Sequence, residues 1–206
     1  MPYIVGMAGG SASGKSQFLK ALKLHMGSQV AIISLDDYYK PLAQQEKDQN
    51  GQVNFDLPTA IDRQRFASDV EKLISGNSIE LIEYTFNNKT NPVGTHKIIE
   101  PADVIVIEGL FVFYFEEISH YFNLSVFIDA DENVRWKRRL HRDTTERGIE
   151  EWLVAYQWNN HVVPAYHEFL APIKNKADML VNNNISFNKP LQILVTYLNA
   201  VKQQLA

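Results

Sequence analysis

Short apolar runs alternate with amphipathic segments along most of the chain. Six runs have the residue content of strands, at residues 3–7, 30–34, 79–84, 104–107, 124–128 and 179–181. Between most of them the apolar residues recur at helical spacing, over residues 15–26, 61–75, 111–122, 132–142, 150–170 and 190–205. This alternation predicts an α/β fold in which helices cover both faces of a mostly parallel sheet.

Residues 36–60 interrupt the alternation. The segment is rich in Gln, Asn and Asp, and its apolar residues show little periodicity. It is too long for an ordinary connection between two elements, so we expect a functional loop or lid there. No linker divides the chain, which predicts a single domain over residues 1–206. Trp136, Trp152 and Trp158 are expected to be core or packing residues.

The composition excludes several classes of protein. The 206 residues are 45% apolar, as in globular chains, and the absence of cysteine excludes disulfides and thiolate metal sites. No apolar run approaches the ~20 residues that span a bilayer, and no export signal is visible. The net charge of −4 argues against general nucleic-acid binding. We therefore expect a cytoplasmic protein without membrane or nucleic-acid partners.

The loop after the first predicted strand carries the clearest chemical signal. Residues 9–16 read GGSASGKS, the G-x-x-x-x-G-K-S spacing of a loop whose backbone amides surround nucleotide phosphates. Its glycines let the backbone curl around the phosphates, and the next helix points its positive end at them. Lys15 is expected to reach the β- and γ-phosphates, and Ser16 to bind Mg²⁺. A flexible linker or an ordinary turn is the alternative, but the strand before the loop and the helix after it favour a phosphate site.

Acidic residues follow three other predicted strands, at the sheet edge where α/β proteins bind ligands. Asp36 and Asp37 end one strand, where an acid can orient Mg²⁺ or accept a proton from an attacking hydroxyl, or can simply cap a turn. Glu108 ends a buried strand and is the expected second Mg²⁺ anchor. Asp129 is its rival, but we expect it to cap the helix that begins near residue 132.

Positive charge is concentrated in one predicted helix and the loop after it. Six basic residues fall within thirteen positions, namely Arg135, Lys137, Arg138, Arg139, Arg142 and Arg147. Spacings of three and four place most of the arginines on one helix face. A solvated basic face and an RNA-binding stripe are two alternatives. Beside a phosphate loop we favour a third, a mobile lid whose arginines gain partners only when phosphates arrive.

Five motifs in order resemble the uridine–cytidine kinases, in the phosphoribulokinase/uridine kinase group of P-loop kinases. They are GGSASGKS, LDDYY from residue 35, NFDLP from residue 54, IEG from residue 107 and RRLHRDTTERG from residue 138. The resemblance extends from residue 4 to about residue 181. It implies a P-loop kinase three-layer sandwich, similar to nucleoside monophosphate kinases, with an arginine-bearing lid at about 142–150 and substrate-side loops at about 36–60 and 84–98.

The resemblance also implies an activity. The expected reaction is transfer of the γ-phosphate of ATP, with Mg²⁺, to the 5′-hydroxyl of uridine or cytidine. The expected partners are these small molecules, and the resemblance is compatible with a homo-oligomer. Asp36 corresponds to the catalytic base of the family, and Asp56 corresponds to the aspartate that binds the ribose hydroxyls. The expected catalytic residues are Asp36 and the phosphate-binding Lys15.

The motifs and the resemblance together give the complete sets of expected site residues. The ATP and phosphate set is Gly9, Gly10, Ser11, Ala12, Ser13, Gly14, Lys15, Ser16, Gln17, Arg142 and Arg147. The substrate set is Tyr39, Phe55, Asp56, Tyr84, Phe86, Lys89, Arg139 and Gln157. The metal set is Ser16, Glu108 and Asp36.

Three positions depart from the family pattern. Lys89 stands where the family usually has a histidine that contacts the pyrimidine, and Ile149 stands where it has an arginine facing the base. Leu57 replaces the histidine of the family's NFDHP. The phosphoryl-transfer residues are therefore kept while the base-reading residues are changed. A sibling kinase that acts on another nucleoside or a sugar phosphate is the alternative.

Two other classes of protein fit parts of the sequence. DQNG at residues 48–51 fits the D-x-x-G of a P-loop GTPase switch, but it lies in a polar loop rather than at a strand end. NKTN at residues 88–91 also lacks the aspartate that reads guanine. An RNA-binding module would use the arginine helix, but the acidic net charge and the lack of interleaved aromatic residues oppose it.

Overall fold

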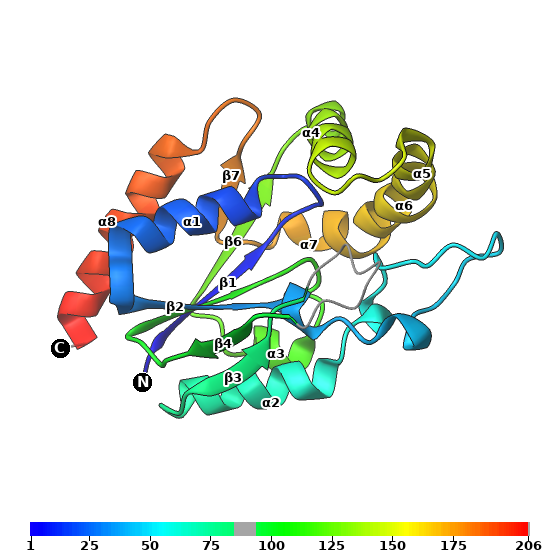
Figure 1. Ribbon diagram of the computed structural model, residues 1–206. Coiled ribbons are helices and arrows are strands. Elements are labelled where there is room, and N and C mark those ends of the chain that lie inside the picture. The colour runs from blue at the N-terminus through cyan, green and yellow to red at the C-terminus, as the bar shows by residue number, and fades with distance from the viewer. Residues whose placement is uncertain (85–93, 206) are drawn as a thin grey trace.

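The computed structural model describes residues 1–84 and 94–205. Five parallel strands form the main sheet in the order β2-β5-β1-β6-β7, namely β1 (Tyr3–Ala8), β2 (Val30–Ser34), β5 (Val104–Glu108), β6 (Leu124–Asp129) and β7 (Met179–Asn182). All five carboxyl ends therefore lie at one edge of the sheet (Figure 1). The predicted parallel sheet is confirmed.

Helices cover both faces of this sheet, which completes the predicted three-layer α/β fold (Figure 1). One face is covered by α1 (Lys15–Met26) and α8 (Asn188–Leu205), and the other by α2 (Arg63–Ile74) and α3 (Glu116–Ser119). Successive residues of a strand point to opposite faces, so β5 sends Val104 and Val106 into one core and Ile105 and Ile107 into the other. This is why its whole run is apolar.

A third group of helices lies beyond the carboxyl edge of the sheet. It contains α4 (Glu132–Thr145), α5 (Glu151–Gln157), α6 (Val163–Ala165) and α7 (Ala171–Lys174) (Figure 1). Two π-helical turns, Trp158–Val162 and Tyr166–Leu170, join the last three, where a continuous helix was predicted over residues 150–170. Such turns are rare and are frequent at functional sites.

Residues 79–84 do not join the main sheet. Instead, β3 (Ile79–Ile82) pairs antiparallel with β4 (His96–Ile99), a strand that was not predicted. Ile79 and Leu81 are buried in the core that contains α2, while the alternate residues are exposed. This hairpin buries only one face, so it packs beside the main sheet rather than within it.

The helix predicted at residues 111–122 is reduced to the short α3. Phe111, Val112 and Phe115 are completely buried, so this stretch is apolar on several sides and fills the core as turns. None of the helices in the described part of the chain is both long and apolar enough to cross a bilayer.

Two predictions for single residues are wrong. Asp131, not Asp129, occupies the N-cap position of α4. Asp129 is the last residue of β6, so its carboxylate points elsewhere and accepts hydrogen bonds from Tyr166 and Lys174. Trp152 is 63% exposed and does not pack in the core, whereas Trp158 is buried.

Candidate active site

The phosphate-type loop, which carries the GGSASGKS motif of residues 9–16, joins β1 to α1 and is held by the end of the sheet. Gly14 has φ 100° and a Cβ there would lie 2.2 Å from Asn183 Nδ2, so only glycine fits. The Asn183 side chain donates a hydrogen bond of 2.8 Å to the Ser13 carbonyl. Lys15 Nζ donates to the Gly9 carbonyl at 2.8 Å. These contacts hold the loop between the end of the sheet and the start of α1.

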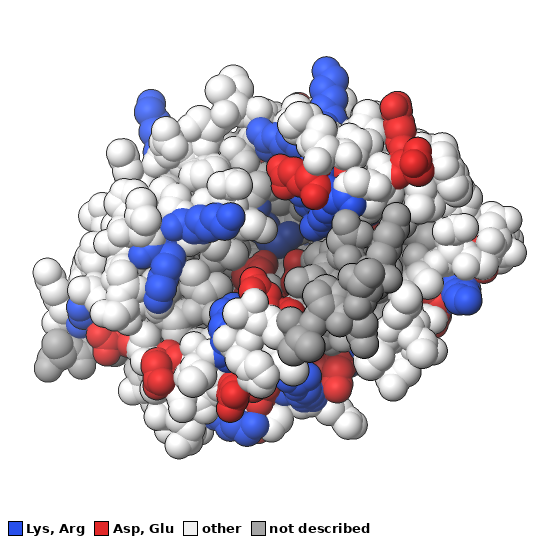
Figure 2. Space-filling view, in the orientation of Figure 1, with Lys and Arg blue, Asp and Glu red and all other residues white. Residues whose placement is uncertain are grey.

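Most of the predicted site residues line one cleft of about 440 Å³, around which charged side chains gather (Figure 2). They are Gly10, Ser11, Ala12, Ser13, Gly14, Lys15, Ser16, Gln17, Asp36, Tyr39, Phe55, Asp56, Glu108, Arg139, Arg142, Arg147 and Gln157. Gly9 and Tyr84 are not among the lining residues, but the Tyr84 ring lies 5.2 Å from that of Tyr39. Phe86 and Lys89 lie outside the described residues.

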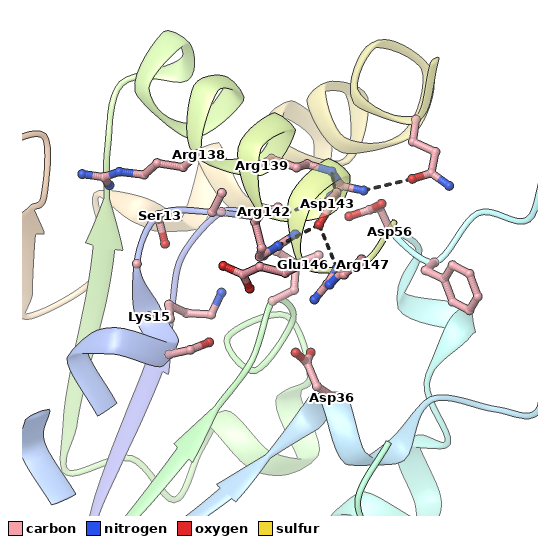
Figure 3. Close-up of a pocket in the computed structure, with 18 of the residues that line it drawn as sticks. Ser13, Lys15, Asp36, Asp56, Arg138, Arg139, Arg142, Asp143, Glu146 and Arg147 are labelled. Atoms are coloured by element: carbon pink, nitrogen blue, oxygen red, sulfur yellow. Dashed lines mark hydrogen bonds and ion pairs between the residues drawn. The ribbon is translucent and has the colours of Figure 1, made fainter. Parts of the chain in front are cut away.

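Two acids lie at the carboxyl ends of neighbouring strands: Asp36 follows β2 (Figure 3), and Glu108 is the last residue of β5. Glu108 is 7% exposed and accepts a hydrogen bond from Ser34 Oγ at 2.5 Å. Burial and the nearby charge of Asp36 raise the pKa of Glu108 to about 7. Burial also raises the pKa of Asp36, although Lys15, Arg147 and Arg142 oppose the shift. The site therefore disfavours negative charge at both acids until a cation arrives.

The donor set fits a magnesium ion that is carried by a nucleotide. Magnesium prefers oxygen ligands and is usually bound by one or two carboxylates together with phosphate oxygens and water. Asp36, Glu108 and the Ser16 hydroxyl all line the cleft beside the phosphate-type loop. Within the described residues, no cluster of three or more acidic or histidine side chains forms a metal site by itself. The arrangement therefore suits Mg²⁺ bound with phosphates rather than a resident metal.

Asp37, the neighbour of Asp36, has a different environment. Its buried carboxylate accepts hydrogen bonds from the Tyr84 amide at 3.2 Å and from Lys97 Nζ at 3.4 Å. These bonds fasten the turn after β2 to the β3–β4 hairpin. Asp36 is therefore the member of the pair that faces the cleft.

Asp143 gathers three of the predicted arginines at the end of α4 (Figure 3). Its carboxylate is fully buried, and its distances to the nearest guanidinium nitrogens are 3.2 Å for Arg139, 2.8 Å for Arg142 and 3.1 Å for Arg147. The expectation that these arginines gain partners only when phosphates arrive is therefore wrong. The three guanidinium groups therefore lie close together in the cleft that the phosphate-type loop also lines, where their charge favours an anionic ligand.

The other end of the cleft combines aromatic rings with a half-buried acid, Asp56. The rings of Tyr39 and Phe55 lie 5.6 Å apart, edge to face. Burial raises the pKa of Asp56, and the charge of Arg139 opposes the shift. Arg139 also donates to Gln157 Oε1 at 3.3 Å and to Ser11 Oγ at 2.9 Å. This end can hold a flat ring and accept hydrogen bonds from hydroxyl groups.

Asp143 and His161 are among the cleft residues that sequence reasoning missed. Asp143 stands four residues after Arg139 and four before Arg147, which is the spacing of ion pairs on one helix face and could have identified it. His161 gave no such signal because its partner, Asp48, is 113 residues away in the chain.

Comparisons of the sequence and the fold with known proteins identify relatives of this chain. Uridine kinase of Lactobacillus helveticus (strain DPC 4571) is 32% identical over 205 residues, which cover 98% of this chain and 97% of that protein. Uridine kinase-like protein 3 of Arabidopsis thaliana is 31% identical over 96% of this chain, but the match spans only 43% of that protein. D-glycerate 3-kinase from Cryptococcus neoformans var. grubii shares the fold, with a TM-score of 0.61 and 18% identity over 88% of this chain and 86% of that one. Residues 4–187 match the phosphoribulokinase/uridine kinase family, and the chain belongs to this family.

Proposed function

We propose that this chain is a phosphotransferase that moves the γ-phosphate of ATP to the 5′-hydroxyl of uridine or cytidine, which gives UMP or CMP. One observation carries the proposal: one cleft holds the phosphate-type loop at one end, aromatic rings and the half-buried Asp56 at the other, and Asp36 with them. The L. helveticus relative, named a uridine kinase, matches over nearly its whole length.

Different residues of the cleft would bind the phosphates and accept the proton in phosphoryl transfer. Lys15, Arg142 and Arg147 would bind the phosphates and stabilise the charge of the transferring group. Asp36 would accept the proton of the attacking hydroxyl, and its raised pKa makes it a stronger base than an ordinary aspartate. Mg²⁺, held by Ser16, Glu108 and Asp36, would neutralise charge on the phosphates. The enzyme would lower the barrier mainly by positioning the two substrates.

The acceptor end supports a ribonucleoside. Asp56 can accept hydrogen bonds from both ribose hydroxyls, and the rings of Tyr39 and Phe55 can contact a flat base. A 2′-deoxy substrate would leave one acceptor direction of Asp56 unpaired, which costs roughly 1–3 kcal/mol. We therefore expect ribonucleosides to exceed their deoxy forms in kcat/KM by about ten-fold or more.

A second candidate is a sibling kinase with another hydroxylated acceptor. Ile149 lines the cleft but offers no hydrogen bond, so base recognition at that position is weakened. The D-glycerate 3-kinase with the same fold shows that this architecture is not restricted to one acceptor. In either case we propose one domain that acts in the cytoplasm on small molecules.

The test is an ATP-coupled assay of the purified protein across a panel of acceptors. The panel contains uridine, cytidine, their deoxy forms, purine nucleosides, nicotinamide riboside and ribulose 5-phosphate. We expect the highest kcat/KM with uridine or cytidine and a clear deficit for the deoxy forms. Phosphorylation of a sugar phosphate without phosphorylation of any nucleoside would replace the proposal with the sibling kinase.

A further inference from the structure

A small hairpin at residues 46–54 projects from the loop that follows β2 and lies beneath α5 and α6 (Figure 1). An isolated bridge pairs Lys47 with Val53. The Asp48 amide donates to the Gln52 carbonyl at 2.8 Å, and the Asn54 amide donates to the Glu46 carbonyl at 2.9 Å. The hairpin therefore has its own backbone hydrogen bonds, but it is too short to be stable without support from the rest of the protein.

That support converges on the carboxylate of Asp48. It accepts a hydrogen bond of 2.7 Å from the Tyr156 hydroxyl, and His161 Nε2 lies 2.7 Å away. It also accepts from the amides of Asn50 and Gln52, each at 2.9 Å. Burial would raise the pKa of Asp48, but the hydrogen bonds from Tyr156 and His161 outweigh it and hold the pKa well below its ordinary value. The carboxylate is therefore the form that the fold stabilises.

The two partners of Asp48 belong to the helical segment that forms part of the cleft. Tyr156 lies next to Gln157, which lines the cleft and accepts a hydrogen bond from Arg139. His161 is 2% exposed, lines the same cleft, and lies in the π-helical turn that follows α5. Through Tyr156 and His161, Asp48 therefore holds the helical segment that contributes Gln157 and His161 to the wall of the cleft.

The base of the hairpin forms another part of that wall. Val53 lines the cleft, and the chain continues directly into Phe55 and Asp56. The side chain of Asn54 accepts a hydrogen bond of 2.9 Å from the Asp56 amide, which fixes the turn at this point. A displacement of the hairpin would therefore move Phe55 and Asp56 relative to Gln157.

We propose that Asp48 is a positioning residue for the acceptor: it clamps the hairpin to Tyr156 and His161 and thereby fixes Phe55 and Asp56 at the acceptor end of the cleft. The inference rests on the proposed function, because it treats this end as the acceptor site. It also gives a role to the D-x-x-G stretch at residues 48–51, which belongs to a structural contact and not to a nucleotide switch. The contact of Asp48 with Tyr156 and His161 is the clasp. A clasp of this kind acts on acceptor binding and not on the phosphate-type loop, which lies at the other end of the cleft.

The test compares three variants by steady-state kinetics with ATP and uridine. Asp48→Ala removes the clasp and should raise the KM for uridine by about ten-fold or more, while the KM for ATP stays within about two-fold. Asp48→Asn keeps an oxygen for the two amides and turns an NH2 group toward Tyr156 and His161, whose hydroxyl and neutral ring nitrogen can accept a hydrogen bond, so its KM for uridine should rise less than about three-fold. Glu46→Ala is the matched control, because it removes an exposed carboxylate from the same hairpin that has no hydrogen bond or ion pair within the described residues. It should behave as the wild type.

Hydrogen exchange gives a second readout that does not depend on activity. In Asp48→Ala without substrates, the amides of Phe55 and Asp56 should exchange at least ten-fold faster, together with those of residues 46–54. Unchanged exchange at Phe55 and Asp56 overturns the proposal. So does a KM for uridine within about two-fold of the wild type, or an equal rise in the KM for ATP.

These two readouts separate the inference from the proposed function. If the wild type phosphorylates no nucleoside, the proposed function fails, and hydrogen exchange alone decides whether Asp48 positions this wall. If Asp48→Ala does not fold, Tyr156→Phe takes its place, because it removes one hydroxyl from the clasp. In Tyr156→Phe the amides of Phe55 and Asp56 should also exchange faster than in the wild type. Unchanged exchange at these amides would contradict the clasp.

Discussion

Replacing Glu108 with glutamine should stabilise the protein at alkaline pH and lower its activity. The pKa of Glu108 is raised from its ordinary value of 4.5 to about 7, by burial first and by the charge of Asp36 second. The folded protein therefore binds this proton more tightly than the unfolded chain does. The stability that the group contributes is complete below about pH 4.5 and is lost as the pH rises through about 7.

The magnitude follows from the same shift. Each pKa unit corresponds to about 1.4 kcal/mol, so the rise from 4.5 to about 7 makes the ionised side chain cost up to about 3 kcal/mol above pH 7. Glutamine has the shape of protonated glutamate, and its carbonyl oxygen can still accept the hydrogen bond from Ser34. We expect Glu108→Gln to raise the free energy of unfolding by about 2–3 kcal/mol at pH 8, and by less than about 1 kcal/mol at pH 5.

Urea unfolding without nucleotide or Mg²⁺ provides the measurement, at pH 5 and at pH 8. Glu100→Gln is the control, since this glutamate is exposed and the substitution makes the same change of charge. A variant that is less stable than the wild type at pH 8 would refute the reasoning. So would a difference from the wild type that is equal at the two pH values, because the effect would then not come from ionisation.

Three further substitutions test the cleft. Lys15→Ala should lower turnover by orders of magnitude while circular dichroism shows an intact fold, and near-normal turnover would exclude the phosphate-binding role. Asp36→Asn should abolish turnover, because the amide cannot accept the proton, and should leave the ATP affinity measured by calorimetry within a few fold of the wild type. A variant that keeps a tenth or more of normal turnover would show that another residue is the base. Asp143→Asn should raise the KM for ATP by about ten-fold and lower the melting temperature, since it leaves Arg142 and Arg147 without their buried anion. An unchanged KM would show that the arginines do not need Asp143.

Much of the fold follows from patterns within single elements. The apolar run of β5 predicts a strand buried on both faces, and the packing of alternate residues into two cores explains why every position is apolar. A parallel sheet then brings all strand ends to one edge, so the loop before Lys15 could be placed beside Asp36 and Glu108 from the sequence. β4 could not be predicted in this way, because His96 and Lys97 give it no strand-like pattern and only its pairing with β3 defines it.

For the site as well, contacts within one segment could be predicted from the sequence, and contacts between distant segments could not. Asp143 acts within one helix and the loop after it, so the four-residue spacings to Arg139 and Arg147 carry the information. The contact between Asp48 and His161 joins segments 113 residues apart, and no local periodicity records it. The π-helical turns that bring His161 into the cleft also have no propensity signal, since they depend on how the helix packs.

Before substrate binds, the cleft carries two separate imbalances of charge. At the acids, burial outweighs the cations of Lys15, Arg142 and Arg147, so the pKa of Asp36 remains raised. At the arginines, the guanidinium groups of Arg139, Arg142 and Arg147 gather around one buried carboxylate, that of Asp143. Within the proposed function, only a ligand that has both phosphates and a divalent cation corrects both imbalances together. ATP by itself would satisfy the arginines and leave Asp36 and Glu108 resisting ionisation, so this cleft is suited to ATP–Mg²⁺ and not to the free nucleotide.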